Sequence, residues 1–589
     1  MPEYLSPGVY VEEFDSGPVP MQGVSTSTAG FLGLAERGPV EGLPLLITGM
    51  ADFQRNFGGY LSDNAFGVYR YLAYAVEHFF VNGGSRCYVM RVAPEGALPA
   101  ANVQPDEADE KKPGLRIVAR NPGQWGNRII VTLRPASKAK TQILEALDNN
   151  KYRVKSTAGF RAGDVIAFTD ESNAEEEPKR SYHRVVSSLD NVLELADAIP
   201  GDVEDTNLVP TKTLSTREFN LEVAYGSEAE LFENASLNAA APNYIGIVAS
   251  RSALINVSWN EGEPDAAAAD KALSPFETIS GAAEDTGRYQ LTLSGGSDGS
   301  VDSITPADFM GKDLGPGKRT GIQAFIDNDE VSLMAVPGIT DPNVQLALVA
   351  HCENATNRFA ILDAPRDSTK VPDITAHRNY FDTSYAALYS PWLLVFDPFE
   401  KRSVAIPPSG SMAGIYARSD NTRGVHKAPA NEVVRGVTGL YCQYNTGEQD
   451  ILNPRGINLI RQFTGQGIRV WGARTCSSNG LWKYINVRRL FIFVEESIRR
   501  NTNWVVFEPN DAPLWARVQR TIDSFLTTVW RDGALQGSSP GEAFYVDIGP
   551  NTMTQDDIDN GRLICVIGIA AVKPAEFVIF RITQKTATE

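Results

Sequence analysis

The chain has 589 residues, of which 42% are hydrophobic and 21% charged, and this globular composition suits about three or four domains. Its formal net charge of −18 argues against nonspecific nucleic-acid binding. No stretch approaches the roughly 18 uninterrupted apolar residues of a membrane span, and the N-terminus has no signal-peptide pattern. We therefore expect a protein kept in the cytoplasm, with neither nucleic acid nor direct membrane insertion.

Residues 1–22 read as an N-terminal arm. Prolines and glycines surround one short alternating run, Val9–Phe14, which is the pattern of a single strand between chain breakers. A lone strand cannot fold by itself, because its backbone groups need a partner sheet. We expect that partner in the same domain or in another subunit.

Residues 23–100 predict the first part of an α/β core. Apolar residues recur at helical spacing over Asn64–Val81, and Asn82-Gly83-Gly84 is a good stop for that helix. A strand is expected at Arg86–Val92.

Residues 101–300 predict an inserted, outward-facing, β-rich domain. The segment 95–113 is rich in Pro, Ala and acidic residues and suits a linker. The region carries 31 acidic and 20 basic residues, a balance of −11. Short strands are expected at Leu115–Val118, Arg128–Leu133, Val165–Phe168, Val185–Val186, Phe219–Val223 and Tyr289–Leu293.

Residues 301–415 alternate helical stretches with buried strands and predict a middle α/β domain with a parallel sheet. The apolar runs are Val331–Val336, Phe359–Asp363 and Trp392–Phe396. Helices are expected near 343–357 and 374–388.

Residues 416–572 predict the C-terminal part of the core, and 573–589 a C-terminal arm. The last elements are the apolar run Leu563–Val572 and a strand at Glu576–Ile582. Lys573-Pro574 interrupts the chain between them and is a candidate hinge. The whole pattern is that of a mixed α/β multidomain protein.

A helix is expected over Asp511–Gly533. Asp511 suits the N-cap and Pro513 the first turn, and Gly533 suits the stop. The apolar stripe at spacings of three and four is Leu514, Val518, Ile522, Phe525 and Val529. Residues 451–530 carry 5 acidic and 11 basic residues, a balance of +6. This stretch either faces an acidic partner or binds carboxylates within the protein.

Catalytic, cofactor and metal motifs fail on inspection. Gly410-Ser411 resembles the nucleophile turn of subtilisin-like proteases, but that chemistry needs a histidine base, and neither His351 nor His377 has a fitting context. Gly317-Lys318 lacks the spacing of a phosphate-binding loop. The scattered cysteines are expected to be reduced core thiols without a metal. A serine hydrolase stays the alternative, provided that some histidine activates Ser411.

Ten segments, which occur in order along the chain, are distinctive when taken together: SPGVYVEE (6–13), GVSTSTAGFLGLAERGPV (23–40), DFQRNFGG (52–59), FFVNGGSRCYVMRV (79–92), PGQWGNRI (122–129), GGSDG (295–299), APANEVVRGVTGL (428–440), LNPRGINLIRQFTGQGIRVWGARTCSS (452–478), VRRLFIFVEESIRRNTNWVVFEPND (487–511) and GRLICVIGIAAVKPAEFVIFRI (561–582). Together they resemble the contractile tail sheath family, which includes myophage tail sheaths and the sheaths of phage-tail-like injection systems. The region of about 130–290 is poorly matched.

This resemblance implies a structural protein, without a cofactor, that stacks as six-membered rings around an inner tube and contracts to drive the tube through an envelope. Residues 301–415 then carry the family's subtilisin-like label without catalysis. The implied partners are other copies of the chain, the inner tube protein, baseplate and terminal cap proteins, and sister sheath proteins. The chain would assemble in the cytoplasm and become part of a virion tail or tail-like particle. Another structural component of that particle is a further alternative.

The resemblance also implies that the arms reach into neighbouring subunits and complete a shared sheet. The expected strand residues are Val9, Tyr10, Val11, Glu12, Phe14, Phe577, Val578, Ile579, Phe580 and Ile582. We further hypothesise that arginines of the 511–533 helix contact acidic groups on the inner tube. These are Arg517, Arg520 and Arg531.

Overall fold

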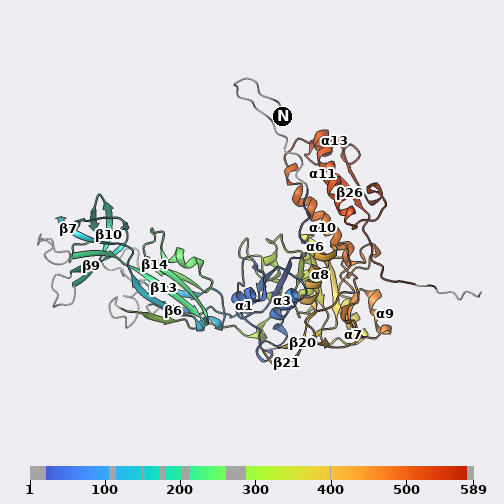
Figure 1. Cartoon of the computed structure of the whole chain (residues 1–589), viewed down its shortest axis with the longest axis horizontal. Helices are drawn as coiled ribbons and strands as arrows, with labels where there is room; N and C mark the ends of the chain where they lie inside the picture. Colours follow the sequence, from blue (N-terminus) through green and yellow to red (C-terminus); the bar gives the residue numbers. More distant parts are fainter. Residues whose placement is uncertain are drawn as a thin grey trace, which may run out of the picture.

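The computed structural model of the protein has an elongated shape with three parts. Figure 1 shows a central α/β core, a β-rich insertion that extends to one side, and a helical C-terminal module that rises from the core. The residues that the structure describes are 21–104, 114–148, 150–170, 179–199, 212–260, 287–397, 399–579 and 581.

One mixed sheet forms the centre of the core. Its inner strands are fully buried apolar runs such as AGFLG and FAILD, which is typical of parallel strands covered on both faces. The inner pairs are parallel, and only the two outermost strands run antiparallel to their neighbours. The order is β2 (Leu45–Ile47), β3 (Cys87–Arg91), β1 (Ala29–Gly33), β17 (Leu333–Ala335), β18 (Phe359–Asp363), β19 (Ala386–Ser390), β23 (Ile457–Phe463) and β24 (Gly467–Val470).

Three chain segments therefore share this sheet. The division expected between residues 23–100, 301–415 and 416–572 does not separate the strands, because parallel pairing joins β1 to β17 and β19 to β23. Sequence periodicity reports which residues are buried, and it does not report which strands lie side by side.

Helices cover both faces of the sheet, and alternate strand residues contact each layer. Phe31 and Ile361 face one layer, whereas Leu32 and Leu362 face the other. The first layer holds α1 (Met50–Phe57), α3 (Leu72–Val81) and α8 (Ser409–Arg423). The second holds α5 (Pro306–Met310), α6 (Pro342–Ala355), α7 (Val371–Arg378) and α9 (Thr446–Leu452).

Three expected elements differ from the structure. The helix expected over 64–81 is split into α2 (Asp63–Phe66), a short 3-10 turn and α3, because the chain takes a positive φ at Gly67. The helix expected over 374–388 ends at Arg378, and only its last three residues, 386–388, are regular again, as the start of the strand β19. The strand expected at 392–396 is β20 (Leu393–Asp397), which pairs outside the parallel sheet with β21 (Arg402–Ile406) and β22 (Gly439–Leu440).

The insertion between the core segments is built almost entirely from strands. Near the core lie two open sheets and the short helix α4 (Ile245–Val248). The first sheet has the order β15 (Ile255–Asn260), β5 (Gly114–Ala119) and β4 (Ala101–Gln104). The second has the order β14 (Glu228–Ala235), β13 (Glu218–Tyr225), β6 (Ile130–Ala136) and β16 (Tyr289–Thr292). The distal part is a closed barrel of β10 (Lys179–Leu189), β11 (Val192–Leu195), β8 (Lys151–Val154), β7 (Lys140–Asp148), β12 (Lys212–Thr216) and β9 (Val165–Asp170).

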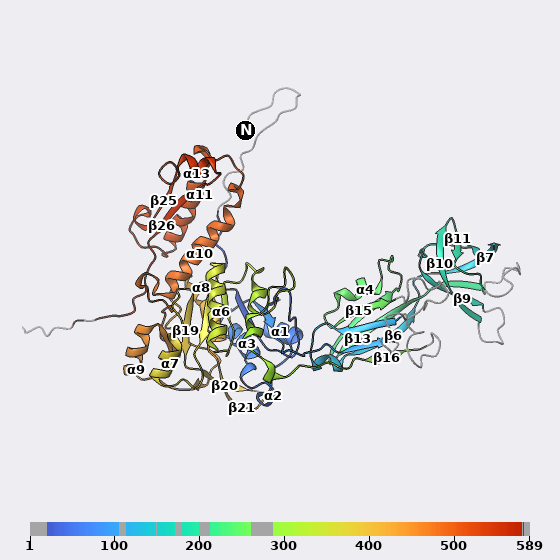
Figure 2. The same ribbon diagram turned by 180° about the vertical axis from the view of Figure 1, so that it is seen from behind.

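The C-terminal module has a hydrophobic cluster of its own and stands apart from the sheet (Figure 2). Within the described residues, no helix is both long and apolar enough to span a bilayer. The module consists of α10 (Ile485–Asn501), α11 (Ala512–Arg531), α12 (Pro540–Ala543), β25 (Phe544–Ile548), α13 (Gln555–Asp559) and β26 (Cys565–Ile569).

Candidate functional site

The C-terminal module contains a two-stranded antiparallel ribbon, β25 and β26. In the described part of the chain these two strands pair only with each other, so each has one edge without a strand partner. The inner face, with Val546 and Ile567, packs on the hydrophobic cluster of the module. The outer face leaves Tyr545 and Val566 exposed, at 59% and 43%. A two-stranded ribbon is marginal alone, so added strands would stabilise it.

The exposed C-terminal segment begins close to this ribbon in sequence. Phe577, Val578 and Ile579 expose between 69% and 77% of their surface, which is unusual for three consecutive large apolar residues. These three residues form no strand with any other residue that the structure describes. The remaining predicted arm residues, Phe580, Ile582 and those of Val9–Phe14, lie outside the described residues. The assignment of both arms to strand exchange stays a prediction.

Helix α11 forms as its sequence predicts. The Asp511 carboxylate accepts a hydrogen bond from the Leu514 backbone N–H at 3.0 Å, and Pro513 occupies the first turn. The five predicted stripe residues are buried, and Leu526 joins them. This stripe packs on the module's hydrophobic cluster and fixes which face of α11 points to solvent.

Two arginines form an exposed ridge on the opposite face of α11. Arg520 and Arg531 are 11 residues apart, which at about 100° per residue places them on nearly one line, about 16 Å apart. Both side chains are exposed, and neither has a carboxylate partner in the described part of the chain. Arg517 is more engaged, since its guanidinium lies 4.1 Å from the Trp504 ring and 3.7 Å from Glu508.

The four arginines of α10 are bound within the chain, although they contribute to the same positive balance. Arg488 stacks on Trp482, and Arg489 pairs with Asp420 in a buried ion pair at 2.5 Å. Arg499 and Arg500 both pair with Glu496. For Arg489, Arg499 and Arg500, the interpretation that the basic stretch binds carboxylates within the protein is correct.

Ser411 does meet a histidine, which sequence reasoning missed. Its hydroxyl lies 3.3 Å from Nδ1 of His78, on α3, which is 333 residues away in the chain. Ser411 is fully buried and His78 is only 4% exposed. Burial lowers the pKa of His78 to about 4, which weakens it as a base at neutral pH. The pair therefore lies inside the α3–α8 interface, where a substrate cannot reach it.

Buried charges of the core are likewise held by internal partners. The Arg358 guanidinium, 1% exposed, donates to the carbonyl oxygens of Phe325 and Asn328, both at 2.9 Å, and contacts His351 at 3.0 Å. Burial raises the pKa of Asp363 to about 6, against the donors of Ser409 and Gly338 that favour its ionised form. These groups hold strands and helices together.

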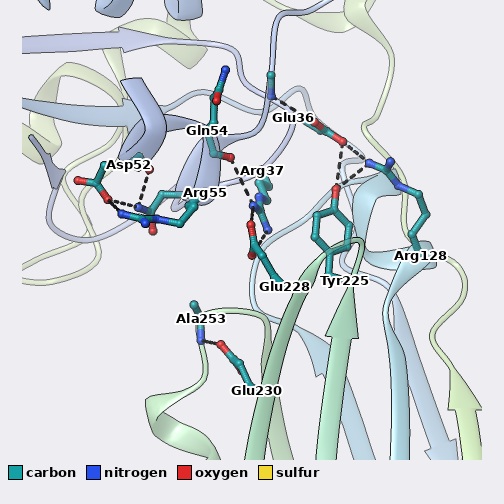
Figure 3. A network of polar contacts seen from close by, with 12 residues as sticks. Glu36, Arg37, Asp52, Gln54, Arg55, Arg128, Tyr225, Glu228, Glu230 and Ala253 are labelled. Carbon is teal, nitrogen blue, oxygen red and sulfur yellow. Dashed lines mark hydrogen bonds and ion pairs between the residues drawn. The ribbon is translucent and has the colours of Figure 1, made fainter. Parts of the chain in front are cut away.

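A polar network joins the core to the insertion (Figure 3). Arg37, just after β1, pairs with Glu228 of β14 at 2.8 Å and lies 4.7 Å from the Tyr225 ring. Arg128 contacts Glu36 and donates to the Tyr225 hydroxyl at 2.7 Å. Because Arg37 is only 5% exposed, this joint is a packed interface.

Comparisons with known proteins identify relatives. The family model of the phage tail sheath protein central domain matches residues 314–476, and that of the phage tail sheath C-terminal domain matches 477–585. A putative prophage major tail sheath protein of Pseudomonas aeruginosa is 26% identical over 286 residues, which cover 46% of this chain and 72% of that protein.

Solved structures add two further likenesses. A chain of the anti-feeding prophage baseplate is 34% identical, over 46% of this chain and 77% of that chain, with a TM-score of 0.39. The sheath complex of an extracellular contractile injection system in the contracted state is 21% identical, across 99% of both chains, with a TM-score of 0.51. The second likeness shows a shared fold over nearly the whole chain.

Proposed function

The chain belongs to the contractile tail sheath family, and we propose that its copies stack as six-membered rings around an inner tube and are joined by their terminal arms. It is thus a structural subunit of a phage tail or tail-like particle. Contraction of the cylinder would drive the tube through a target envelope. Baseplate and cap proteins would close the two ends, and sister sheath proteins would share the cylinder. Assembly would take place in the cytoplasm.

The ribbon β25–β26 is the observation that carries this proposal. It offers two strand edges in the described part of the chain, and the exposed apolar segment Phe577–Ile579 offers a strand without a sheet. Strand addition between copies satisfies both. Because it uses backbone hydrogen bonds, such a link tolerates rigid-body movement of the subunits during contraction.

The arginine ridge of α11 is the proposed contact with the inner tube. Within the residues that the structure describes, Arg520 and Arg531 have no carboxylate partner and can pair with acidic groups outside the chain, whereas Arg517, which flanks them, already pairs with Glu508. Exposed pairs of this kind contribute only about 0–1 kcal/mol each. That weakness suits a contact that repeats along a tube and releases on contraction.

A subunit of this kind needs no catalysis, and we propose that the chain is not an enzyme. The family is a structural one, and the Ser411–His78 pair is buried. A serine-directed phosphonate should leave the folded protein unlabelled. Stoichiometric labelling of Ser411 would instead support the hydrolase alternative.

Electron microscopy of the purified chain tests the proposal. We expect hollow cylinders or rings from the unaltered protein and only single subunits from Val578→Asp, since a carboxylate in the added strand opposes burial at the junction. Leu231→Asp is the matched control, because Leu231 is also exposed but lies on β14 of the insertion. A folded protein that stays monomeric at high concentration would contradict strand exchange.

A further inference from the structure

The chain after β26 remains attached to its own subunit for several residues. Ala571 pairs with Leu535 in an antiparallel bridge, and the Val572 N–H donates to the Ala534 carbonyl at 3.2 Å. The Asn486 side-chain amide donates to the Val572 carbonyl at 3.1 Å. These contacts tie residues 571 and 572 to the C-terminal module.

Four residues after Val572, the carboxylate of Glu576 is bound by side chains of the core. Arg474 donates to both of its oxygens, through Nε at 2.7 Å and Nη2 at 2.8 Å. The Tyr484 hydroxyl donates at 2.9 Å and the Asn453 amide at 2.8 Å. Lys483 adds its ammonium at 3.6 Å. A bidentate arginine with two further donors is a strong and directional way to hold a carboxylate.

The donors are themselves fixed in place. Arg474 follows β24, is 8% exposed, and exchanges two backbone hydrogen bonds with the buried side chain of Asn458 on β23, at 2.7 and 2.8 Å. Burial alone would raise the pKa of Glu576, but the hydrogen bonds from Arg474, Asn453 and Tyr484 lower it to about 2. The carboxylate is therefore ionised at neutral pH.

The contrast with the next residues is abrupt. Glu576 is enclosed, whereas Phe577 immediately after it is 70% exposed. We propose that Glu576 is a clasp that sets the pivot of the C-terminal arm, so that the chain is free to move only from Phe577 onward. This inference rests on the proposed strand exchange. It also moves the pivot past Lys573-Pro574, the hinge that the sequence suggests.

The clasp has two mechanical consequences. If the pivot lay at Lys573, four more residues would be free, which would lengthen the reach of the arm by about 13 Å. A neighbour that pulls on the arm would also peel β26 from β25, because the arm continues directly from that strand. With Glu576 bound to Arg474, the pull passes instead into the eight-stranded sheet.

Distances between spin labels in the unassembled full-length protein locate the pivot. One label is placed at Gln466→Cys, in the exposed β23–β24 turn, and the other at Ala575→Cys or Ile579→Cys, with Cys442 and Cys565 replaced by serine. We expect a narrow distance distribution for 575 and a broad one for 579. Glu576→Ala should broaden the distribution for 575. A broad distribution for 575 in the parent protein, or a narrow one that persists in Glu576→Ala, would overturn the clasp.

Glu145→Ala is the matched control for the label experiment. Glu145 also pairs with an arginine, Arg153, at 2.8 Å, but in the distal barrel. The Glu145→Ala substitution should leave the distance distributions of both labels, at 575 and at 579, unchanged. Broadening in this control would show that loss of any such ion pair loosens the chain, which would also overturn the assignment of the pivot to Glu576.

Urea dissociation of assembled cylinders tests whether the clasp carries load. We expect Glu576→Gln and Arg474→Met each to lower the dissociation midpoint, and the double variant to lower it no further than the stronger single change, because both remove one interaction. A dissociation midpoint equal to that of the parent protein would show that the Glu576–Arg474 contact does not transmit force between subunits. If the parent protein forms no cylinders, the proposed strand exchange is wrong. The distances between labels in the unassembled protein would still show whether Glu576 sets the pivot of the arm.

Discussion

The eight-stranded core and the C-terminal module differ in whether their polar groups have partners within the chain. In the core, the Arg358 guanidinium and the Asp363 carboxylate are buried and bound by neighbours from the same chain. In the module, the ribbon β25–β26 keeps strand edges without partners in the described residues, and α11 presents Arg520 and Arg531 to solvent. From this difference we infer that the ribbon edges and the arginine ridge are the places where neighbouring proteins bind.

The largest expected effect lies in the core. Arg358→Ala leaves the buried Phe325 carbonyl and the part-buried Asn328 carbonyl without their donor and opens a cavity in the core, which should cost about 3–5 kcal/mol of folding free energy. Arg358→Lys should restore little, because an ammonium cannot reproduce the planar fork of donors. Thermal midpoints and soluble yield measure this. A variant that melts with the parent would show that the core does not depend on this group.

A smaller loss of stability is expected from substitution of Glu576, at the start of the C-terminal arm, and this loss depends on pH. The pKa of Glu576 falls from an ordinary 4.5 to about 2 on folding, so its contribution of at most about 3 kcal/mol is complete above pH 4.5 and disappears as pH falls through 2. The difference in thermal midpoint between the parent and Glu576→Gln should therefore shrink from pH 6 to pH 3. A constant difference would mean that the ionised carboxylate is not the cause.

Removal of the insertion should cost less and should spare assembly. Replacing residues 102–293 by a short Gly/Ser turn keeps the bridge between Ala101 and Ser294. Arg37 then loses Glu228, a loss of about 1–3 kcal/mol that Arg37→Gln should partly relieve. Microscopy should still find cylinders, of smaller outer diameter. If the deletion variant fails to fold both with Arg37 and with Arg37→Gln, the insertion is part of the core.

The smallest effect belongs to the arginine ridge. Arg520→Glu with Arg531→Glu should leave cylinders of the chain alone intact but prevent extended sheath around a tube, and high salt should reproduce the defect in the parent protein. Arg251→Glu, in the insertion, with Arg435→Glu provides a charge-matched control at exposed positions away from α11. Normal extended particles from the ridge variant would place the tube contact elsewhere.

The spacing of apolar residues along the chain correctly predicted the helices and strands that are determined by neighbouring residues in the sequence. The stripe of α11 and the buried run of β18 are examples, and the structure confirms both. The sequence could not distinguish a buried strand from a buried helix at Ala386–Ser390, because a short run that is buried on every side has no alternation of polar and apolar residues. It also could not assign Leu393–Asp397 to a separate sheet.

Long-range pairs explain what the sequence could not predict about the site. Ser411 and His78 are 333 residues apart, and Glu576 and Arg474 are 102 apart. A single sequence has no local signal for either pair. The arms are predicted because Pro, Gly and alternating apolar residues are typical of a strand without a sheet, and both the arms and their role in strand exchange stay predictions.

Disulfide trapping between copies tests strand exchange most directly. Two preparations are mixed before assembly, one with Val578→Cys in the arm and one with Val566→Cys in β26, both with Cys442 and Cys565 replaced by serine. We expect covalent dimers on oxidation of the mixed cylinders, and none from either preparation alone. Mixed cylinders that assemble normally yet yield no such dimers would contradict the account, because the arm would then bind somewhere other than the ribbon of a neighbour.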